Sequence, residues 1–422
     1  MGKLETTSGT GSAPRPVPPG GGRPGLMLGL ATVGFAVNFW AWALLSPLGP
    51  KFKDVLHLTP FQQALVVAVP VVVGSLGRIP VGALTDRYGG RLMFPLVSLA
   101  TIVPVLYLGL SGYGSLAGLL VGGFFLGIGG TAFAVGVPFV NAWFQPQRRG
   151  LAIGIFGMGM GGTAISALTT VKLVAAHGTA TPFAVTAAAL AGYAVLAALL
   201  LRDAPGRAIP SQPLSRRLAS TLRLRVTWQA AVLYAVLFGG YVAFSVYLPA
   251  YLKTAYGLTQ ADAANRMAGF VLLAVLMRPV GGWLADRLGP ARVLAAALTV
   301  VGVGAAVQAF TPGLVPVGTA AFLTMAAALG AGSGATFALV ALLAPADKVG
   351  SVTGVVGAAG GLGGFFPPIF MGIVKDQAGS YSLGFVGLLV ATACCLVLAV
   401  WLIRSAAGTA LGGGARASGA PS

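Results

Sequence analysis

The chain has 422 residues, of which 56% are hydrophobic and only 8% charged, and its mean hydropathy is +0.89. Such a composition lies far outside the range of soluble globular domains. The formal net charge of +18 could suggest a nucleic-acid partner, but the basic residues are scattered through connections rather than gathered on one face or helix. The composition therefore predicts a multi-pass protein of the lipid bilayer that binds no nucleic acid.

Long apolar runs, separated by short polar or Gly/Pro segments, predict an all-α membrane protein with twelve transmembrane helices. About 20 helical residues cross a hydrocarbon core of roughly 30 Å. The predicted spans are Leu26–Leu48, Pro60–Leu84, Leu92–Leu110, Ser115–Phe144, Gly150–Val174, Thr181–Leu201, Thr227–Leu252, Asp262–Leu284, Arg292–Phe310, Pro312–Leu343, Gly350–Val374 and Tyr381–Ile403.

A polar, arginine-rich stretch after Leu201 separates the first six spans from the last six. The predicted organisation is a disordered cytoplasmic tail (1–25), an N-terminal six-helix bundle (26–201), a cytoplasmic linker (202–226), a C-terminal six-helix bundle (227–404) and a second disordered cytoplasmic tail (405–422). The first tail is rich in Gly, Pro and Ser and lacks the apolar run of a signal peptide.

The distribution of charge predicts the orientation in the membrane. Most of the 26 lysines and arginines fall in the tails and in connections that share one side with the N-terminus. Cytoplasmic loops carry an excess of such residues. We therefore expect the cell (cytoplasmic) membrane, with both termini cytoplasmic.

The two halves match when they are compared at an offset of 200 positions, as expected for the internal repeats of transporters. Two segments carry the identities. Arg78, Gly82, Leu84, Asp86, Arg87 and Gly89 fall on Arg278, Gly282, Leu284, Asp286, Arg287 and Gly289, and Gly150, Gly154, Gly157 and Gly161 fall on Gly350, Gly354, Gly357 and Gly361.

The segment Gly82-Ala-Leu-Thr-Asp86-Arg87-Tyr-Gly89-Gly-Arg91 resembles the loop motif that follows helix 2 in the major facilitator superfamily, and the segment from Gly282 to Gly289 repeats it after helix 8. The resemblance implies two pseudo-symmetric six-helix bundles (the MFS fold) that rock about a central site. We interpret Asp86, Arg87, Asp286 and Arg287 as gating residues, whose charge pairs latch the bundles. The alternative is a solvated turn that only sets topology.

Arg78 and Arg278 each lie about two helical turns before the aspartate of this motif, which is roughly 12 Å beneath the membrane boundary. Half of the hydrocarbon core is about 15 Å, and an arginine at that depth costs between about 2.5 and 17 kcal/mol. No acidic residue is expected at this depth, since all eight fall in a tail, a connection or a helix end: Glu5, Asp54, Asp86, Asp203, Asp262, Asp286, Asp347 and Asp376.

Without a carboxylate partner, the two arginines are predicted to share a small anion. Guanidinium is planar, permanently charged and suited to planar oxyanions such as nitrate, nitrite, formate or a small carboxylate. The alternative is that the arginines donate to backbone carbonyls beside broken helices.

Glycines and aromatic residues on the neighbouring spans predict a small site with flat walls. Gly157 and Gly161 on helix 5 and Gly357 and Gly361 on helix 11 let the backbones approach closely. The candidate walls and polar contact are Phe133, Tyr234, Phe238, Phe337 and Asn38. Core packing for each aromatic residue, and an interhelical hydrogen bond for Asn38, are the alternatives.

These segments resemble the nitrate/nitrite porter family of the superfamily, which carries one arginine on helix 2 and one on helix 8. Its glycine-rich signatures correspond to Gly154–Gly162 and Gly357–Phe366, and its aromatic site residues to Phe133, Tyr234 and Phe238. One departure is evident, because many members have an anion-contacting asparagine in the helix-5 signature, and the nearest position here is Gly161.

The predicted function is transport of nitrate and nitrite by alternating access, with no cofactor, no metal and no enzymatic activity, in a monomer. The only histidines, His57 and His177, lie in outside connections, so exchange is favoured over proton coupling, which usually needs a titratable group in the pathway. The alternatives are proton–nitrate symport, exchange of formate, oxalate or another small carboxylate, and a non-transporting anion sensor.

Overall fold

A computed structural model describes residues 23–144, 146–205, 214–345 and 348–417. Within these residues, twelve helical segments are long and apolar enough to cross a membrane. The predicted all-α fold and the number of spans are confirmed. The first span runs from Pro24 to Leu56, well past the predicted end at Leu48, because the helix continues through polar residues that a count of apolar residues leaves out.

The first six spans form the N-terminal bundle. Its elements are α1 (Pro24–Trp42), α2 (Leu45–Leu56), α3 (Pro60–Leu76), α4 (Arg78–Tyr88), α5 (Gly90–Leu110), η1 (Gly112–Gly114), α6 (Leu116–Leu126), η2 (Gly127–Thr131), α7 (Ala132–Trp143), α8 (Pro146–Gly157), η3 (Met158–Gly161), α9 (Gly162–His177) and α10 (Thr181–Leu200).

The last six spans form the C-terminal bundle. Its elements are α12 (Arg225–Tyr256), α13 (Gln260–Leu288), α14 (Pro290–Ala309), η4 (Leu314–Gly318), α15 (Thr319–Leu343), α16 (Val349–Gly363), α17 (Phe366–Ala378) and α18 (Ser382–Ala417). A short helix, α11 (Leu214–Leu222), lies in the segment between the bundles. The helix α18 continues beyond residue 404, where the sequence predicted a disordered tail, since extending an existing helix is far easier than starting one.

The internal repeat extends to the ends of helices 2 and 8. The side chains of Thr59 and Thr259 accept hydrogen bonds from the backbone N–H groups of Gln62 and Asp262, which caps the start of each helix. The same two helices end at Gly89 and Gly289, both with φ of +86°, a conformation that favours glycine. These pairs of residues are again 200 positions apart.

Five spans, helices 1, 2, 4, 5 and 11, are each divided into two or more elements, and most of the breaks lie at glycines. Helix 2 breaks at Gly77, between α3 and α4, while helices 4 and 5 pass through the tightened turns η2 and η3. Glycine is a poor helix former, and tightened turns often mark functional segments. Helices 7 and 8 are each a single unbroken element, α12 and α13.

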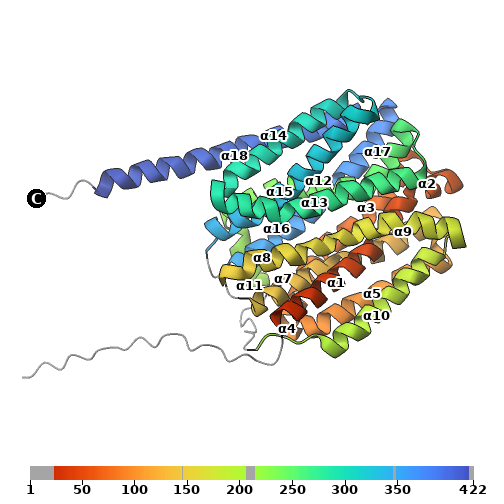
Figure 1. Ribbon diagram of the computed structural model, residues 1–422, viewed down its shortest axis with the longest axis horizontal. Coiled ribbons are helices and arrows are strands. Elements are labelled where there is room, and N and C mark those ends of the chain that lie inside the picture. The colour runs from red at the N-terminus through yellow and green to blue at the C-terminus, as the bar shows by residue number, and fades with distance from the viewer. Residues whose placement is uncertain (1–22, 145, 206–213, 346–347, 418–422) are drawn as a thin grey trace, which may run out of the picture.

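The two bundles lie side by side, with α1–α10 in one and α12–α18 in the other (Figure 1). The start of α1 and the long end of α18 lie on one face, which we call the terminal face, and α2 and α17 reach the opposite or far face. The bundles are joined by hydrogen bonds near the far face. Ser46 Oγ lies 3.0 Å and 2.8 Å from the carbonyl oxygens of Ser245 and Val246.

Two further polar contacts connect the bundles at the far face. Lys253 forms an ion pair with Asp54, and Gln260 Nε2 donates to the carbonyl of Pro47 at 2.8 Å. Together with the close approach of α17 to the start of α3, these contacts close the far face in this structure.

Candidate functional site

Arg78 is buried, with 7% of its surface exposed, and is the first residue after the break in helix 2. Its Nε donates to the carbonyl of Gly130 at 3.4 Å, and its Nη1 donates to the carbonyl of Gly357 at 2.8 Å. Gly130 lies in η2 of the same bundle, whereas Gly357 lies in α16 of the opposite bundle. Arg78 therefore bridges the two bundles near the middle of the molecule.

Arg278 is buried to the same degree, with 8% exposed. Its Nη2 donates to Tyr234 Oη at 2.9 Å within the C-terminal bundle. Its Nη1 lies against Met160 Sδ, which belongs to η3 of the N-terminal bundle. Each arginine thus reaches across to the other bundle, Arg78 to a backbone carbonyl and Arg278 to a thioether, which is a weak acceptor.

The ring of Phe238 lies close to both guanidinium groups. Its centre is 5.9 Å from the guanidinium carbon of Arg78 and 5.3 Å from that of Arg278. The two charges can therefore be no farther apart than the sum of these distances. Phe133 lies 5.2 Å from Arg78 on another side. Such contacts stabilise buried cations, but two like charges in a poorly solvated space still repel each other.

The predicted aromatic walls form two layers. Tyr234 stacks on Phe238, with ring centres 4.7 Å apart and planes inclined by 9°. Phe337 meets Tyr234 edge to face, at 4.8 Å and 60°, so it contacts this stacked pair through Tyr234. The arginines, Phe133, Tyr234 and Phe238 are thus brought together, and Phe337 lies in the second layer.

Neither arginine has a carboxylate partner in the part of the chain that the structure describes. Two ion pairs, Lys253–Asp54 and Arg266–Asp262, lie near the far face, and Asp203 accepts from the backbone N–H groups that begin α5. The acidic residues Glu5 and Asp347 lie outside the described residues. The alternative that the arginines donate to backbone carbonyls holds for Arg78 and not for Arg278.

Helix 11 supplies both an acceptor and space. The carbonyl of Gly357 receives Arg78, and the absence of a side chain at Gly361 leaves room for Ser75 and Arg78, because a Cβ there would overlap Ser75 Oγ and lie 3.3 Å from Arg78 Nη1. Gly157 and Gly161 differ, since a Cβ at either position would meet nothing within 4 Å.

The contacts of Asn38 and of the helix-5 signature differ from those predicted. Asn38 Nδ2 donates to Ser98 Oγ and to the carbonyl of Gly34, both at 2.8 Å, which is the interhelical alternative and leaves Asn38 outside the group around the arginines. In the helix-5 signature, Met160 and not Gly161 reaches an arginine. The only feature of the sequence that could have indicated this contact is that Met160 is a large side chain within a run of glycines.

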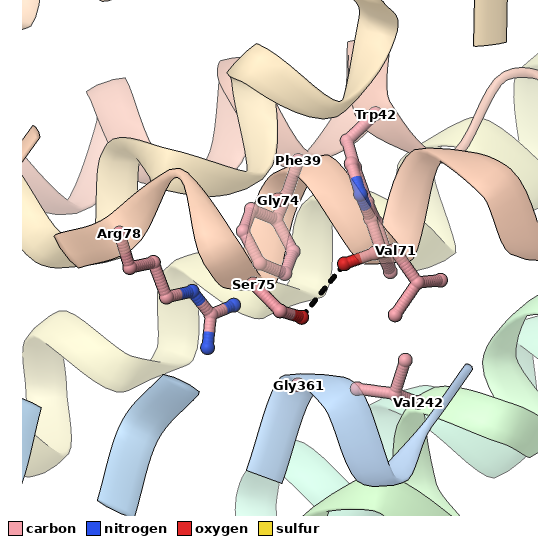
Figure 2. A pocket seen from close by; sticks show the side chains of 8 residues that line it. All are labelled: Phe39, Trp42, Val71, Gly74, Ser75, Arg78, Val242 and Gly361. Carbon is pink, nitrogen blue, oxygen red and sulfur yellow. Dashed lines mark hydrogen bonds between the residues drawn. The ribbon is translucent and has the colours of Figure 1, made fainter. Parts of the chain in front are cut away.

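A small cavity adjoins Arg78 on its far-face side. In this structure the space that the cavity encloses is about that of one water molecule. Figure 2 shows its lining, which comprises Phe39, Trp42, Val71, Gly74, Ser75, Arg78, Val242 and Gly361. Of these residues, only Arg78 and Gly361 were predicted from the sequence to lie at or near the site, although Ser75 lies one turn before Arg78.

The predicted gating residues lie at the terminal ends of helices 2 and 8. The guanidinium carbon of Arg87 is 5.5 Å from the ring centre of Tyr88, and that of Arg287 is 4.1 Å from Trp283. Asp86 and Asp286 belong to α4 and α13. A latch between the bundles at this level stays a prediction.

The sequence matches the family model described as Major Facilitator Superfamily over residues 31–266 and 233–420. The chain belongs to the major facilitator superfamily. It is therefore a membrane transporter and not an enzyme, and the resemblance to the nitrate/nitrite porter family is confirmed by relatives within the superfamily.

Three relatives cover most of this facilitator. It is 51% identical over 370 residues to the probable nitrate/nitrite transporter NarK2 of Mycobacterium tuberculosis (86% of this chain, 92% of that protein). It is 35% identical over 385 residues to the nitrite extrusion protein of Bacillus subtilis (90% and 95%). It is 33% identical over 363 residues to the probable nitrate transporter NarT of Staphylococcus haemolyticus (86% and 92%).

Solved structures of other facilitators share the fold at low identity. A bacterial homologue of the human lysosomal transporter Spinster, in an inward-facing and occupied conformation, is 19% identical with a TM-score of 0.65, covering 92% of this chain and 96% of the other. The fucose:proton symporter of E. coli gives the same identity and TM-score, covering 89% and 98%. At this identity the likeness supports the fold alone.

Proposed function

We propose that this facilitator transports nitrate and nitrite across the cytoplasmic membrane by alternating access, exchanging one anion for the other. The observation that carries the proposal is the pair of buried arginines, one from each bundle, which both lie beside the ring of Phe238 and have no carboxylate partner among the described residues. The names of the relatives, which refer to nitrate and nitrite, agree with this chemistry.

The surroundings of the arginines favour a small planar oxyanion. Guanidinium groups present parallel N–H donors, and the rings of Phe133 and Phe238 give flat walls beside them. A cationic substrate would be repelled by the two arginines.

The contacts of the arginines also suggest how anion binding and bundle movement are connected. Arg78 donates to Gly357 and Arg278 contacts Met160, each in the opposite bundle. An anion between the guanidinium groups would replace these contacts and relieve the repulsion between the charges. Movement of the empty carrier would carry two uncompensated charges through the rearrangement, which favours exchange over one-way transport.

The orientation and oligomeric state belong to the same proposal. The excess of arginines near the terminal face supports a cytoplasmic location for that face and for both termini. The far face, closed in this structure by Ser46 and by the Lys253–Asp54 pair, then faces outward. A monomer is sufficient, because one chain supplies both arginines and their aromatic neighbours.

Counterflow in proteoliposomes tests this function. Vesicles loaded with nitrate, nitrite, formate or chloride are given labelled nitrate outside, with and without a pH gradient. We expect uptake only when nitrate or nitrite is inside. Accumulation of nitrate driven by a pH gradient without internal anion would establish proton symport and refute exchange, and preference for formate would identify a carboxylate exchanger. Binding without flux would identify a sensor.

Variants of the arginines test the site itself. We expect Arg78→Ala and Arg278→Ala to abolish counterflow, and the corresponding lysine variants to recover little, because lysine lacks the fork of N–H donors. Arg266→Ala is the matched control, since Arg266 pairs with Asp262 near the far face. Transport at the wild-type rate in either Arg→Ala variant would refute the site.

A further inference from the structure

The cavity beside Arg78 lies on the path between the far face and the pair of arginines. Val71, Gly74 and Ser75, which line it, precede Arg78 on helix 2 and lie nearer the far face. Tyr234 and Gly357, by contrast, lie nearer the terminal face on helices 7 and 11 than the cavity residues Val242 and Gly361. The guanidinium of Arg78 therefore stands between the cavity and the rest of the site.

We propose that this cavity widens, when the far face opens, into a second anion subsite in which Ser75 and Arg78 together hold a small oxyanion that enters from the far face. The proposal rests on the function proposed above. Figure 2 shows the guanidinium of Arg78 and the hydroxyl of Ser75 facing the same space beside Gly361. Both side chains are more than nine-tenths buried, at 7% and 1% exposed.

Arg78 has donors available for this second position. A guanidinium offers five N–H donors, and the described partners of Arg78 take only its Nε and Nη1. An anion in the cavity can therefore be bound while Arg78 keeps its contact with the opposite bundle.

The hydroxyl of Ser75 can turn toward an anion at little cost. It donates to the carbonyl of Val71 at 2.7 Å, one turn earlier in the same helix. That carbonyl also accepts the backbone N–H of Ser75 in a regular α-helix, so it keeps a partner when the hydroxyl rotates. A bond from the hydroxyl to an anion is charge-assisted and stronger than the one it replaces.

The subsite belongs to one half of the repeat only. Trp42 and Val242, which line the cavity, are repeat mates, but the mate of Ser75 is Val275, a buried residue with no hydrogen-bond donor in its side chain. The cavity can be formed because Gly361 leaves space that any side chain would fill against Ser75. The internal symmetry is thus broken where an additional donor is gained.

The position of the cavity suggests that an anion binds there first, before it moves between the two arginines. Tyr241 Oη and Thr163 Oγ1, 3.3 Å apart, join the bundles beside the site, and the Ser46 contacts join them closer to the far face. When these contacts part, an anion arriving from the far face reaches Ser75 and Arg78 before it can lie between the two arginines.

Transport kinetics in oriented membrane vesicles test the subsite. For Ser75→Ala we expect the half-saturating nitrate concentration to rise about ten-fold for uptake from the far face, which is the effect of losing one hydrogen bond to a charged group. For uptake from the terminal face we expect a change of less than about two-fold, since the hydroxyl assists loading from one side only. Ser75→Thr, which keeps the hydroxyl, is expected to retain most of the affinity.

Ser333→Ala is the matched control. Ser333 is equally buried and donates to the carbonyl of Leu329 one turn earlier, at 2.6 Å, but it does not line the cavity. Ser75→Cys keeps the shape of the side chain but replaces the hydroxyl by a thiol, a weak donor, and it serves as the test if Ser75→Ala does not fold. An unchanged half-saturation in Ser75→Ala, or in Ser75→Cys where that variant replaces it, would overturn the subsite, and so would an equal change from both faces.

The same experiment separates the subsite from the proposed function. If the wild-type protein carries formate or chloride but neither nitrate nor nitrite, the proposed substrate is wrong, and the one-sided effect of Ser75→Ala on the anion that is carried still decides on the subsite. If the wild-type protein carries nitrate and Ser75→Ala behaves like Ser333→Ala, the function stands and the subsite is refuted.

Discussion

Replacing Gly361 by alanine tests whether the close approach of helix 11 to Arg78 matters for transport. The added methyl group would overlap Ser75 Oγ, lie 3.0 Å from Ser75 Cβ and lie 3.3 Å from Arg78 Nη1. The hydroxyl can rotate away, but the Cβ of Ser75 is fixed to its helix. Either α16 must move away from α3 or the guanidinium must leave its place.

Overpacking of this kind costs about 1–3 kcal/mol. The cost falls on the arrangement in which α16 packs against α3 and Arg78 contacts Gly357. Since about 1.4 kcal/mol corresponds to a factor of ten, we expect the ratio of maximal rate to half-saturating concentration for nitrate to fall about 5- to 150-fold.

Gly161→Ala is the control, because Gly161 is the repeat mate of Gly361 and a Cβ there meets nothing within 4 Å. Nitrate counterflow in proteoliposomes gives the ratio for each variant, and size-exclusion elution with thermal denaturation verifies folding. We expect Gly161→Ala to stay within about two-fold of the wild type, as a substitution without contacts should. Equal transport by the two variants would refute the packing argument.

Three further substitutions address the other contacts. Tyr234→Phe keeps the stacked ring but removes the acceptor of Arg278 Nη2, so nitrate counterflow should lose about ten-fold in efficiency; unchanged counterflow would show that this bond does not position the arginine. Ser46→Ala removes the donor to the opposite bundle and should favour far-face opening about five-fold, seen as faster labelling of a cysteine placed at the far face. Gly89→Ala should lower the Tm more than Gly289→Ala, because both residues have φ of +86° but only Gly89 faces the Asp203 carboxylate; equal decreases would contradict a role for that contact.

The sequence by itself determined the class of protein, the number of spans and the repeat. These features depend on local properties, since a helix in lipid must satisfy its own backbone hydrogen bonds and show a long apolar run. The same logic singled out Arg78 and Arg278, because a charge in an apolar span is costly wherever the chain folds. The comparison at an offset of 200 positions then placed both at one depth.

The tertiary structure alone decided which groups surround the arginines. Gly130 and Gly357 act through backbone carbonyls, which residue identity does not reveal. Met160 reaches Arg278 because η3 changes the direction of side chains in helix 5, and Asn38 turns to Ser98 because helix rotation sets which face it occupies. Such outcomes depend on how two bundles pack, and packing is a property of residues far apart in the chain.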